Sequence, residues 1–150
     1  MGIALQEAAE AALQGEVPVG CVIVFEEQII GRAHNLRETL ADPTAHAEIL
    51  ALQQAAKNKG QWRLSGATVY VTLEPCPMCT GALINARIER LVYGCDDAKA
   101  GCCGTLHQLA QNAGFNHQFV ITSGVCAEES AMLLQSFFRA RRKKKPKTTT

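Results

Sequence analysis

The stretch Ala67-Thr68-Val69-Tyr70-Val71-Thr72-Leu73-Glu74-Pro75-Cys76-Pro77-Met78-Cys79 decides the fold of this chain of 150 residues. Residues 67–72 are rich in β-branched and apolar side chains and predict a buried strand. Two prolines follow, and proline is tolerated in the first turn of a helix, so residues 76–86 are expected to be helical. The stretch therefore predicts a strand that passes directly into a helix.

Cys76 and Cys79 lie at the start of this expected helix. Residues three apart share one helix face, so both sulfur atoms point the same way. The N-terminal end of a helix carries a partial positive charge, which favours two thiolates there. In α/β folds, ligands bind beyond the carboxyl ends of strands, and both cysteines fall at such an end.

Helix and strand patterns alternate along the rest of the chain. Helices are expected at residues 2–13, 45–59, 104–112 and 126–142, and Gly15 and Gly60 end the first two. Strands are expected at residues 17–25, 28–33, 90–94 and 119–121, the first two as a hairpin across Glu26-Glu27. This alternation predicts an α/β fold with helices on both faces of the sheet.

His46-Ala47-Glu48 supplies the remaining groups of a candidate metal site. One imidazole and two cysteines can hold a zinc ion and leave its fourth position open for water, which makes a catalytic site. Zinc with three protein ligands lowers the pKa of a bound water from about 15.7 to about 7. The hydroxide formed in this way can attack the amine-bearing carbon of an aromatic base. The leaving amine must then be protonated, so a carboxylate is needed that moves protons beside the metal without binding it. Glu48 is the candidate for this role.

His46 and Glu48 place a condition on the local structure. Residues two apart do not face each other on a regular helix. Both side chains reach one metal only if His46 lies in an irregular first turn, and Asp42-Pro43-Thr44 just before it is typical of a helix start. We therefore expect two helix N-termini to converge on one zinc ion per chain, bound by His46, Cys76 and Cys79.

Other interpretations of these residues stay open. A single C-x-x-C in an intracellular protein is also typical of redox or structural zinc sites, and a single histidine on an apolar stretch is typical of a core. A structural zinc site needs a fourth donor. No available donor shows a second paired-ligand spacing near a hairpin or helix start, although the adjacent pair at 102–103 keeps this alternative open. These donors are His34, Cys95, Cys102, Cys103, His107, His117 and Cys126.

Composition places the chain among ordinary globular proteins. Its length fits one domain with a substantial core, and 47% of its residues are hydrophobic and 19% charged.

The seven cysteines form no regular disulfide framework, which indicates a reducing cytosol. The N-terminus lacks the pattern of a signal peptide, and no stretch approaches the roughly 18 apolar residues of a membrane helix. We expect a soluble, cytoplasmic protein.

The positive charge of the chain is concentrated at its C-terminus. The net charge is +1, but seven of the fifteen basic residues lie beyond residue 138, which leaves eight against fourteen acids in the rest. Affinity for a polyanion is therefore expected at this end. The alternative is a solvated helix end, where the helix dipole favours basic residues, followed by a disordered tail at residues 143–150. The seven residues are Arg139, Arg141, Arg142, Lys143, Lys144, Lys145 and Lys147.

Taken together, these motifs give the chain a resemblance to bacterial tRNA-specific adenosine deaminases of the cytidine-deaminase-like superfamily. H-x-E followed by P-C-x-x-C is a signature of zinc nucleobase deaminases and identifies the superfamily. The segments at 97–101 and 137–142 are more specific. The resemblance covers nearly the whole chain and rests on Glu16-Val17-Pro18-Val19-Gly20, Asn35, Asp42-Pro43-Thr44-Ala45-His46-Ala47-Glu48, Leu73-Glu74-Pro75-Cys76-Pro77-Met78-Cys79, Asp97-Ala98-Lys99-Ala100-Gly101 and Phe137-Phe138-Arg139-Ala140-Arg141-Arg142.

The resemblance implies a three-layer αβα sandwich with a five-stranded mixed sheet. Residues 1–142 would form one zinc-dependent deaminase domain, followed by the basic tail at 143–150. The implied protein is a cytoplasmic homodimer that hydrolyses adenosine to inosine at the wobble position of a tRNA anticodon and releases ammonia. The first helix is several residues shorter than usual, and Cys102-Cys103 stands where small residues are more typical. Neither departure touches the chemistry directly.

The resemblance also implies residues that bind the substrate. Asn35 would contact a flipped base through its amide, although an asparagine after a strand is also typical of a turn. Asp97 would accept a hydrogen bond from a ribose 2′-hydroxyl, the group by which proteins distinguish RNA from DNA. Its alternative role is a cap of the following turn. Arg139, Arg141 and Arg142 would contact RNA phosphates.

Other functions fit parts of the sequence. Guanine deaminases share the His-Ala-Glu and Glu-Pro-Cys-Pro-Met-Cys pattern, but an RNA substrate explains the basic C-terminal helix and a neutral purine does not. Small cytidine deaminases use cysteine as the first ligand, so His46 counts against them. An inactive, zinc-stabilised RNA-binding module has no need of Glu48 beside the metal. The same holds for a scaffold subunit whose partner supplies catalysis.

Overall fold

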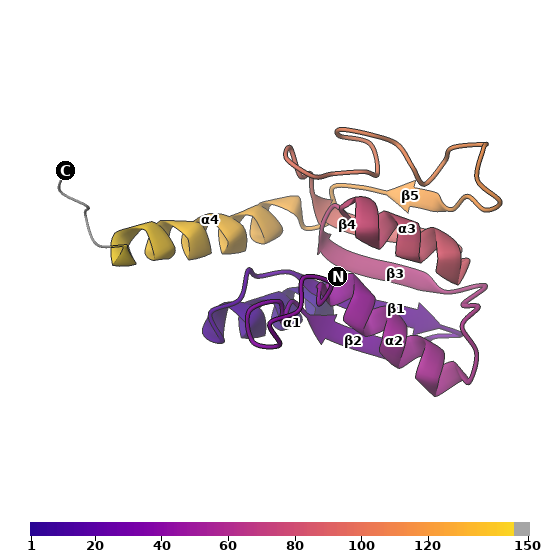
Figure 1. The fold of residues 1–150 in the computed structure, drawn as a ribbon, viewed down its shortest axis with the longest axis horizontal. Coiled ribbons are helices and arrows are strands. Elements are labelled where there is room, and N and C mark those ends of the chain that lie inside the picture. Colours follow the sequence, from indigo (N-terminus) through magenta and orange to yellow (C-terminus); the bar gives the residue numbers. More distant parts are fainter. Residues whose placement is uncertain (146–150) are drawn as a thin grey trace.

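We describe residues 1–145 of the chain in a computed structural model. Five strands form one mixed sheet in the order β2-β1-β3-β4-β5, and helices cover both of its faces (Figure 1). This arrangement confirms the expected three-layer αβα fold with a five-stranded mixed sheet. The elements are α1 (Gly2–Leu13), β1 (Gly20–Phe25), β2 (Gln28–His34), α2 (Ala47–Lys59), β3 (Thr68–Leu73), α3 (Pro77–Ala86), β4 (Arg90–Cys95), β5 (Val120–Thr122) and α4 (Ala127–Lys144).

The directions of the strands bring three strand ends to one edge of the sheet. β1 is antiparallel to both of its neighbours, β2 and β3, whereas β3, β4 and β5 are parallel. β2, β3 and β4 therefore run the same way, and their carboxyl ends lie at the same edge. Residues that follow these strands, such as Asn35, Glu74 and Asp97, meet there although they are far apart in the sequence.

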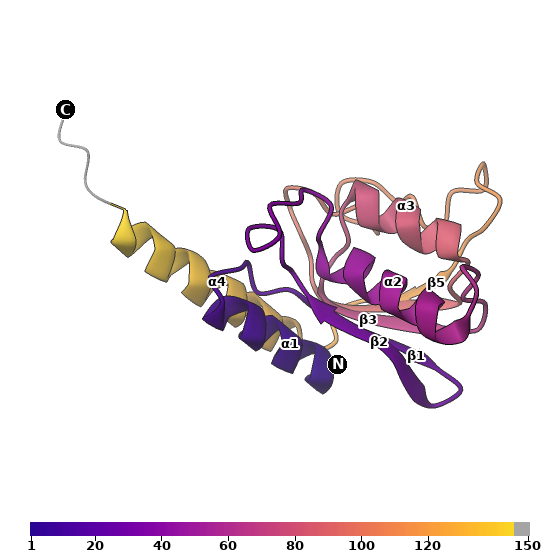
Figure 2. The same cartoon turned by 60° about the horizontal axis from the view of Figure 1, so that its bottom comes forward.

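The two helix layers approach the sheet closely. α2 and α3 cover one face, and α1 and α4 cover the other (Figure 2). A Cβ atom on Gly31 of β2 would overlap the carbonyl oxygen of Ala51 in α2, and one on Gly20 of β1 would overlap that of Ala4 in α1. A larger residue at either glycine would push its helix away from the sheet.

The hydrophobic core is built on the central strands. Val69 and Val71 of β3 are fully buried, as are Leu91 of β4 and Leu83 of α3. Burial of such a side chain stabilises the fold by about 1.5–3 kcal/mol. β1, β3 and β4 therefore form a rigid frame for the loops at the carboxyl edge.

The hairpin between β1 and β2 turns through Glu26 and Glu27, as predicted. Their φ angles are 48° and 63°. Two-residue hairpin loops require this left-handed conformation, and Asn and Gly adopt it more readily than Glu. The register shifts between Ile23 and Val24, which marks a β-bulge in the hairpin.

Helices begin within two residues of the positions that the sequence predicts. α1 has the expected bounds, whereas α2 begins at Ala47 and α3 at Pro77. Both helices begin later than predicted because the residue before each, His46 or Cys76, is an N-cap with an extended backbone. The irregular helix start that the spacing of His46 and Glu48 demands is therefore confirmed.

The predicted helix at residues 104–112 is wrong. This segment has no helix and is mostly turns. Gly104 has a φ of 140°, which lies outside the helical region. The backbone N–H groups of Cys103 and Thr105 donate to the side chain of Glu74. These tertiary hydrogen bonds hold the segment as a loop.

α4 is the longest of the described helices and projects beyond the sheet (Figure 1). It ends at Lys144, two residues after the predicted end, so the first two residues of the expected tail are helical. Residues 146–150 of that tail lie outside the described part of the chain. Neither α4 nor any other helix within residues 1–145 is long and apolar enough to cross a membrane.

Candidate active site

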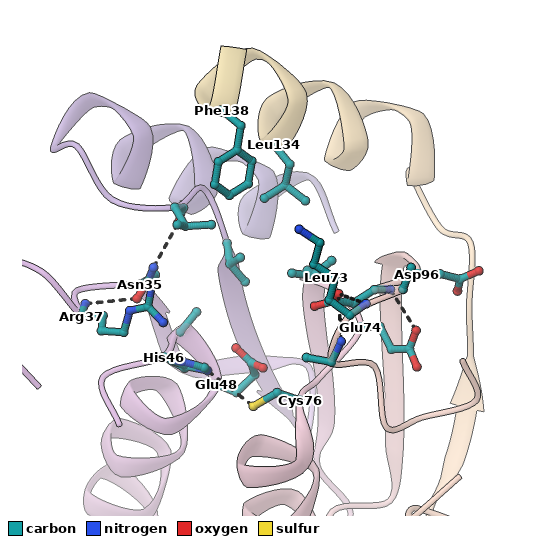
Figure 3. A pocket seen from close by; sticks show the side chains of 17 residues that line it. Asn35, Arg37, His46, Glu48, Leu73, Glu74, Cys76, Asp96, Leu134 and Phe138 are labelled. Carbon is teal, nitrogen blue, oxygen red and sulfur yellow. Dashed lines mark hydrogen bonds between the residues drawn. The ribbon is translucent and has the colours of Figure 1, made fainter. Parts of the chain in front are cut away.

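A cavity of about 500 Å³ opens at the sheet edge where β2, β3 and β4 end. Figure 3 shows Asn35 and Arg37 on one side of it, Glu74 and Asp96 on the other, and Phe138 above. Its walls are the loops that follow the three strands, and α4 closes it from above. The cavity therefore collects side chains from widely separated parts of the chain.

His46, Cys76 and Cys79 come together at this cavity. His46 caps α2 and Cys76 caps α3, so the two helix N-termini converge as predicted. Nδ1 of His46 lies 3.6 Å from Sγ of Cys76 and 3.5 Å from Sγ of Cys79. Within residues 1–145, these three are the only group of three or more candidate ligands whose donor atoms lie within 4.8 Å of one another.

This donor set fits a zinc ion. Zinc forms bonds of about 2.3 Å to sulfur and about 2.0–2.1 Å to nitrogen, so tetrahedral geometry separates a sulfur from a nitrogen ligand by about 3.6 Å. The observed spacings match this value. No fourth donor among the described residues joins the group, so a closed structural zinc site has no support there. Three ligands leave one coordination position for water or substrate.

The two thiols differ in acidity. The pKa of the Cys76 thiol is lowered to about 4, chiefly because Cys79 donates a hydrogen bond to its sulfur and also because His46 lies beside it. The same hydrogen bond, together with burial, raises the pKa of the Cys79 thiol. The lowered pKa favours the thiolate form of Cys76, and thiolate is the form that binds metal.

Glu48 lies in the first turn of α2 and is 4% exposed. Burial raises the pKa of its carboxyl above the ordinary range. The residue lines the cavity, and Figure 3 shows its carboxyl beside His46 and Cys76. A carboxyl group in this position can exchange protons with a molecule bound in the cavity.

Asn35 lines the cavity at the end of β2 and is 7% exposed. Its Oδ1 accepts a hydrogen bond of 3.1 Å from the backbone N–H of Arg37, and its Nδ2 donates one of 3.4 Å to the carbonyl of Val17. These bonds show the turn role that the sequence left open, and they fix the orientation of the amide. One N–H and one lone pair of the amide remain for a ligand.

Asp97 lines the opposite wall of the cavity. Its Oδ1 accepts hydrogen bonds from the backbone N–H groups of Lys99 at 2.9 Å and Ala100 at 3.2 Å. Asp97 therefore caps the turn that follows it, which is the alternative that the sequence left open. The cap uses one carboxylate oxygen and leaves the other for a ligand.

α4 contributes an apolar roof. Leu134 and Phe138 line the cavity from one face of this helix, and Figure 3 shows both side chains pointing into it. Arg139, Arg141 and Arg142 do not line the cavity and are exposed on the helix beyond the roof. The structure thus separates an apolar roof at Leu134 and Phe138 from the three arginines beyond it.

Sequence reasoning missed further lining residues. Arg37 follows Asn35 by two positions, and Lys99 follows Asp97 by two, so each wall carries an exposed cation. Glu74 stands directly before the cysteine motif and also lines the cavity. Adjacency to a motif is the signal that could have found all three. Leu134 and Phe138 carry a helical spacing that does not distinguish a cavity roof from a core face.

The fold and the site define a deaminase of the cytidine-deaminase-like class. An open site of one imidazole and two thiols, with a carboxyl group beside it, lies at the carboxyl edge of an αβα sandwich. A sequence profile of the MafB19-like deaminase family matches residues 1–142.

Two similar proteins indicate the family within this class to which the chain belongs. The chain is 54% identical to the tRNA-specific adenosine deaminase of Bacillus subtilis (strain 168), over 95% of this chain and 88% of the relative. It is 47% identical to the tRNA-specific adenosine deaminase of Haemophilus influenzae, over 97% of this chain and 84% of the relative. The chain is a MafB19-like deaminase and belongs to the family of tRNA-specific adenosine deaminases.

Solved structures show the same similarity. One, from work on A-to-I editing by tRNA deaminases at the wobble position of transfer RNA, superposes with a TM-score of 0.86 and 42% identity, covering 89% of this chain and 97% of that one. The guanine deaminase of Bacillus subtilis superposes with a TM-score of 0.62 and 30% identity, covering 97% and 93%. Guanine deaminases therefore share the fold at a greater distance.

Proposed function

We propose that this protein hydrolyses the wobble adenosine of a tRNA anticodon to inosine and releases ammonia. One observation carries the proposal: an imidazole, two thiols and the buried carboxyl of Glu48 meet at a cavity. The chain that holds them is 54% identical to a tRNA-specific adenosine deaminase. The proposal includes one zinc ion per chain, a homodimer and a cytoplasmic location.

Glu48 is the proton carrier of the proposed reaction. A zinc ion held by His46, Cys76 and Cys79 would lower the pKa of a water to about 7 and so supply a nucleophile at neutral pH. Glu48 accepts one proton from the attacking water and donates it to the ring nitrogen of the base, while the water oxygen bonds to the amine-bearing carbon. It then takes the remaining proton from the new hydroxyl group and transfers it to the amine, so that the C–N bond breaks, ammonia leaves and the carbonyl of inosine forms. Because Glu48 is buried at the cavity, it can pass these protons without exchange into bulk water.

The cavity walls hold the base for this attack. The fixed amide of Asn35 offers one donor and one acceptor to a purine edge. The ring of Phe138 and the side chain of Leu134 give an apolar surface against which an unstacked base packs. The free carboxylate oxygen of Asp97 can accept a hydrogen bond from a ribose 2′-hydroxyl, which favours RNA over DNA.

The exposed basic residues of α4 bind the RNA outside the cavity. Arg139, Arg141 and Arg142 follow the roof residue Phe138 directly, so a strand whose base enters the cavity passes close to them. Phosphate contacts of this kind supply affinity without sequence information. They explain why a chain with an acidic body carries a basic C-terminal helix.

Deamination of free guanine is the second candidate. The guanine deaminase of Bacillus subtilis shares 30% identity and the same fold with this chain. The zinc chemistry serves either amine, so the metal site does not discriminate between the two substrates. The basic end of α4 favours RNA, because a neutral purine offers no charge for it to bind.

A substrate comparison tests the proposal. The substrates are an anticodon stem-loop with adenosine at the wobble position, the same loop with cytidine there, free adenosine and free guanine. We expect inosine in the adenosine loop, little reaction with the cytidine loop, and near-background turnover of both free compounds. Binding energy from the rest of the RNA orients the reacting base, so kcat as well as affinity should fall for the isolated nucleoside.

Two further results decide between the candidates. Pairing the anticodon into a duplex should make the adenosine loop a poorer substrate, because extruding the base then costs a few kcal/mol more. Efficient formation of xanthine from free guanine, with an inert stem-loop, would replace the proposed function with the second candidate.

A further inference from the structure

Two buried carboxylates lie behind the two walls of the cavity, and the proposed chemistry uses neither. Glu16 is 0% exposed and Glu74 is 2% exposed. Glu16 precedes β1, and Glu74 follows β3. A buried charge is costly unless hydrogen bonds satisfy it, so the donors around each carboxylate show what it does.

Glu16 ties down the wall that carries Asn35 and Arg37. Its Oε1 accepts a hydrogen bond from the backbone N–H of Glu38 at 3.0 Å. Its Oε2 accepts one from the backbone N–H of Thr39 at 2.7 Å and one from the hydroxyl of Thr39 at 2.6 Å. Residues 37–41 are exposed and belong to no helix or strand. Their other hydrogen bonds join them to residues 35–42, so the three bonds to Glu16 are the ones that tie this segment to another part of the described chain.

Glu74 ties down the opposite wall in the same way. The backbone N–H of Asp97 donates to its Oε1 at 3.1 Å, and those of Cys103 and Thr105 donate to its Oε2 at 3.0 and 3.1 Å. The Thr105 hydroxyl donates to Oε1 as well. A Cβ atom on Gly101 would overlap this carboxylate, so the loop wraps tightly around it.

The hydrogen bonds of Glu74 decide between a contact with substrate and a positioning role. A carboxylate has about four lone-pair positions, and four donors fill those of Glu74. Glu74 lines the cavity, but it has no acceptor left for a ligand. Glu16 is fully buried and reaches no ligand at all.

We propose that Glu16 and Glu74 are positioning residues that hold the two cavity walls in their binding conformation before the substrate arrives. This inference rests on the proposed function. Ordering a mobile loop costs free energy. If the wall is already ordered in the free protein, RNA binding does not have to supply this free energy, whereas for a loosened wall it does. Once RNA is bound, the wall is ordered in either case. Loosening a wall should therefore raise KM and leave kcat nearly unchanged.

Threonine variants test each wall without removing a buried charge. Thr39→Val and Thr105→Val each delete one hydroxyl donor and keep the backbone donors, whereas Thr39→Ser and Thr105→Ser keep the hydroxyl. Thr122→Val is the matched control, because the Thr122 hydroxyl accepts a hydrogen bond from Arg90 and neither residue lines the cavity. Each valine variant is measured with the adenosine stem-loop.

We expect each valine variant at the two walls to raise KM about threefold to tenfold, the range expected for one lost hydrogen bond. Its kcat should stay within about twofold, and the serine variant should restore KM. Zinc content and the Thr122→Val control should match the wild type. A fall in kcat at constant KM, as from a smaller folded fraction, would overturn the proposal for that wall. So would an unchanged KM.

Amide hydrogen exchange separates this inference from the proposed function. If the wild-type protein does not react with the stem-loop, the proposed function is wrong. The exchange measurement needs no substrate, so it still tests the anchoring role in that case. Thr39→Val should speed exchange at the amides of Glu38 and Thr39, and Thr105→Val should speed it at the amides of Asp97 and Cys103. Exchange equal to that of the wild type would overturn the anchoring role.

Discussion

His46 and Cys76 stand thirty positions apart in the chain, yet Nδ1 of His46 lies 3.6 Å from Sγ of Cys76. Each residue caps a helix, and both helices lie on the same face of the sheet. The two N-termini point to one place because β2 and β3 run in the same direction and each leads into its helix at the same edge. The meeting of these candidate ligands is therefore a consequence of strand direction.

Loss of Glu48 should abolish turnover without loss of the metal. General acid–base groups commonly contribute 10² to 10⁴-fold, and a sole proton carrier should lie at about 10⁴-fold or more. We expect Glu48→Ala to keep one zinc per chain, measured by elemental analysis, and to lose activity by this factor. Glu10→Ala, on the exposed side of α1, is the control. Near-normal activity of zinc-loaded Glu48→Ala would remove this residue from the mechanism.

Removal of one zinc ligand should lower both metal content and thermal stability. A ligand that binds only the folded state stabilises it by mass action. Cys79→Ser should therefore bind less than one zinc per chain and melt at a lower temperature than the zinc-loaded wild type. Cys126→Ser, at the start of α4 and outside the metal group, should keep its zinc. Full zinc content in Cys79→Ser would exclude Cys79 as a ligand.

The exposed arginines of α4 should set part of the salt dependence of RNA binding. Each phosphate contact to single-stranded RNA contributes about −0.7 to the slope of log K against log salt. Replacement of Arg139, Arg141 and Arg142 by Gln should make the slope about 2 less steep, if all three contact phosphate. Arg90→Gln, at the opposite edge of the sheet, should not change the slope. An unaltered slope in the triple variant would mark this helix end as a solvated surface.

Deletion of residues 141–150 removes six of the seven basic residues beyond residue 138. If three to seven of these seven charges engage the anticodon, they contribute roughly −2 to −5 to the salt slope. The deletion should remove most of that contribution and raise the apparent KM much more than it changes kcat at saturation. A large loss of kcat at unchanged KM would point to a role of this segment in the chemistry instead.

The hairpin turn offers a stability test. Glu26 and Glu27 occupy left-handed conformations that Asn and Gly adopt with less strain. Glu26→Asn combined with Glu27→Gly should stabilise the protein by about 1 kcal/mol, which corresponds to a rise in Tm of about 2–4 °C for a chain of this size. Calorimetry measures this change. A lower Tm would show that the two glutamates make stabilising contacts.

The carboxyl of Glu16 predicts a pH dependence of stability. Burial opposes its ionisation, but hydrogen bonds from Thr39 and Glu38 outweigh burial and hold its pKa below the ordinary range. A carboxyl whose pKa is lower in the folded state stabilises that state above the unfolded-state pKa, and loses this effect as pH falls through the folded-state pKa. Glu16→Gln should therefore melt below the wild type at about pH 7 and approach it towards about pH 3. A difference in Tm that stays constant over this range would contradict the assignment.

Local signals in the sequence were sufficient for the helices and strands that lead to the metal site. Two prolines around Cys76 predicted a helix start, and the spacing of His46 and Glu48 required an irregular one, which the extended backbone of His46 supplies. Local signals failed at residues 104–112. There the backbone donors bind the side chain of Glu74, about thirty positions earlier, and no local propensity contains that contact.

The sequence by itself determined the layered α/β fold and singled out three candidate metal ligands and a candidate proton carrier, because spacing and capping encode them within a few residues of each motif. Only the tertiary structure decided which other side chains share the cavity. Antiparallel β1 between β2 and β3 brings Asn35 and Asp97 to opposite walls of one cavity, and α4 places Phe138 above them. It also decided that buried Glu16 and Glu74 anchor these walls, since strand order and direction set which distant segments meet.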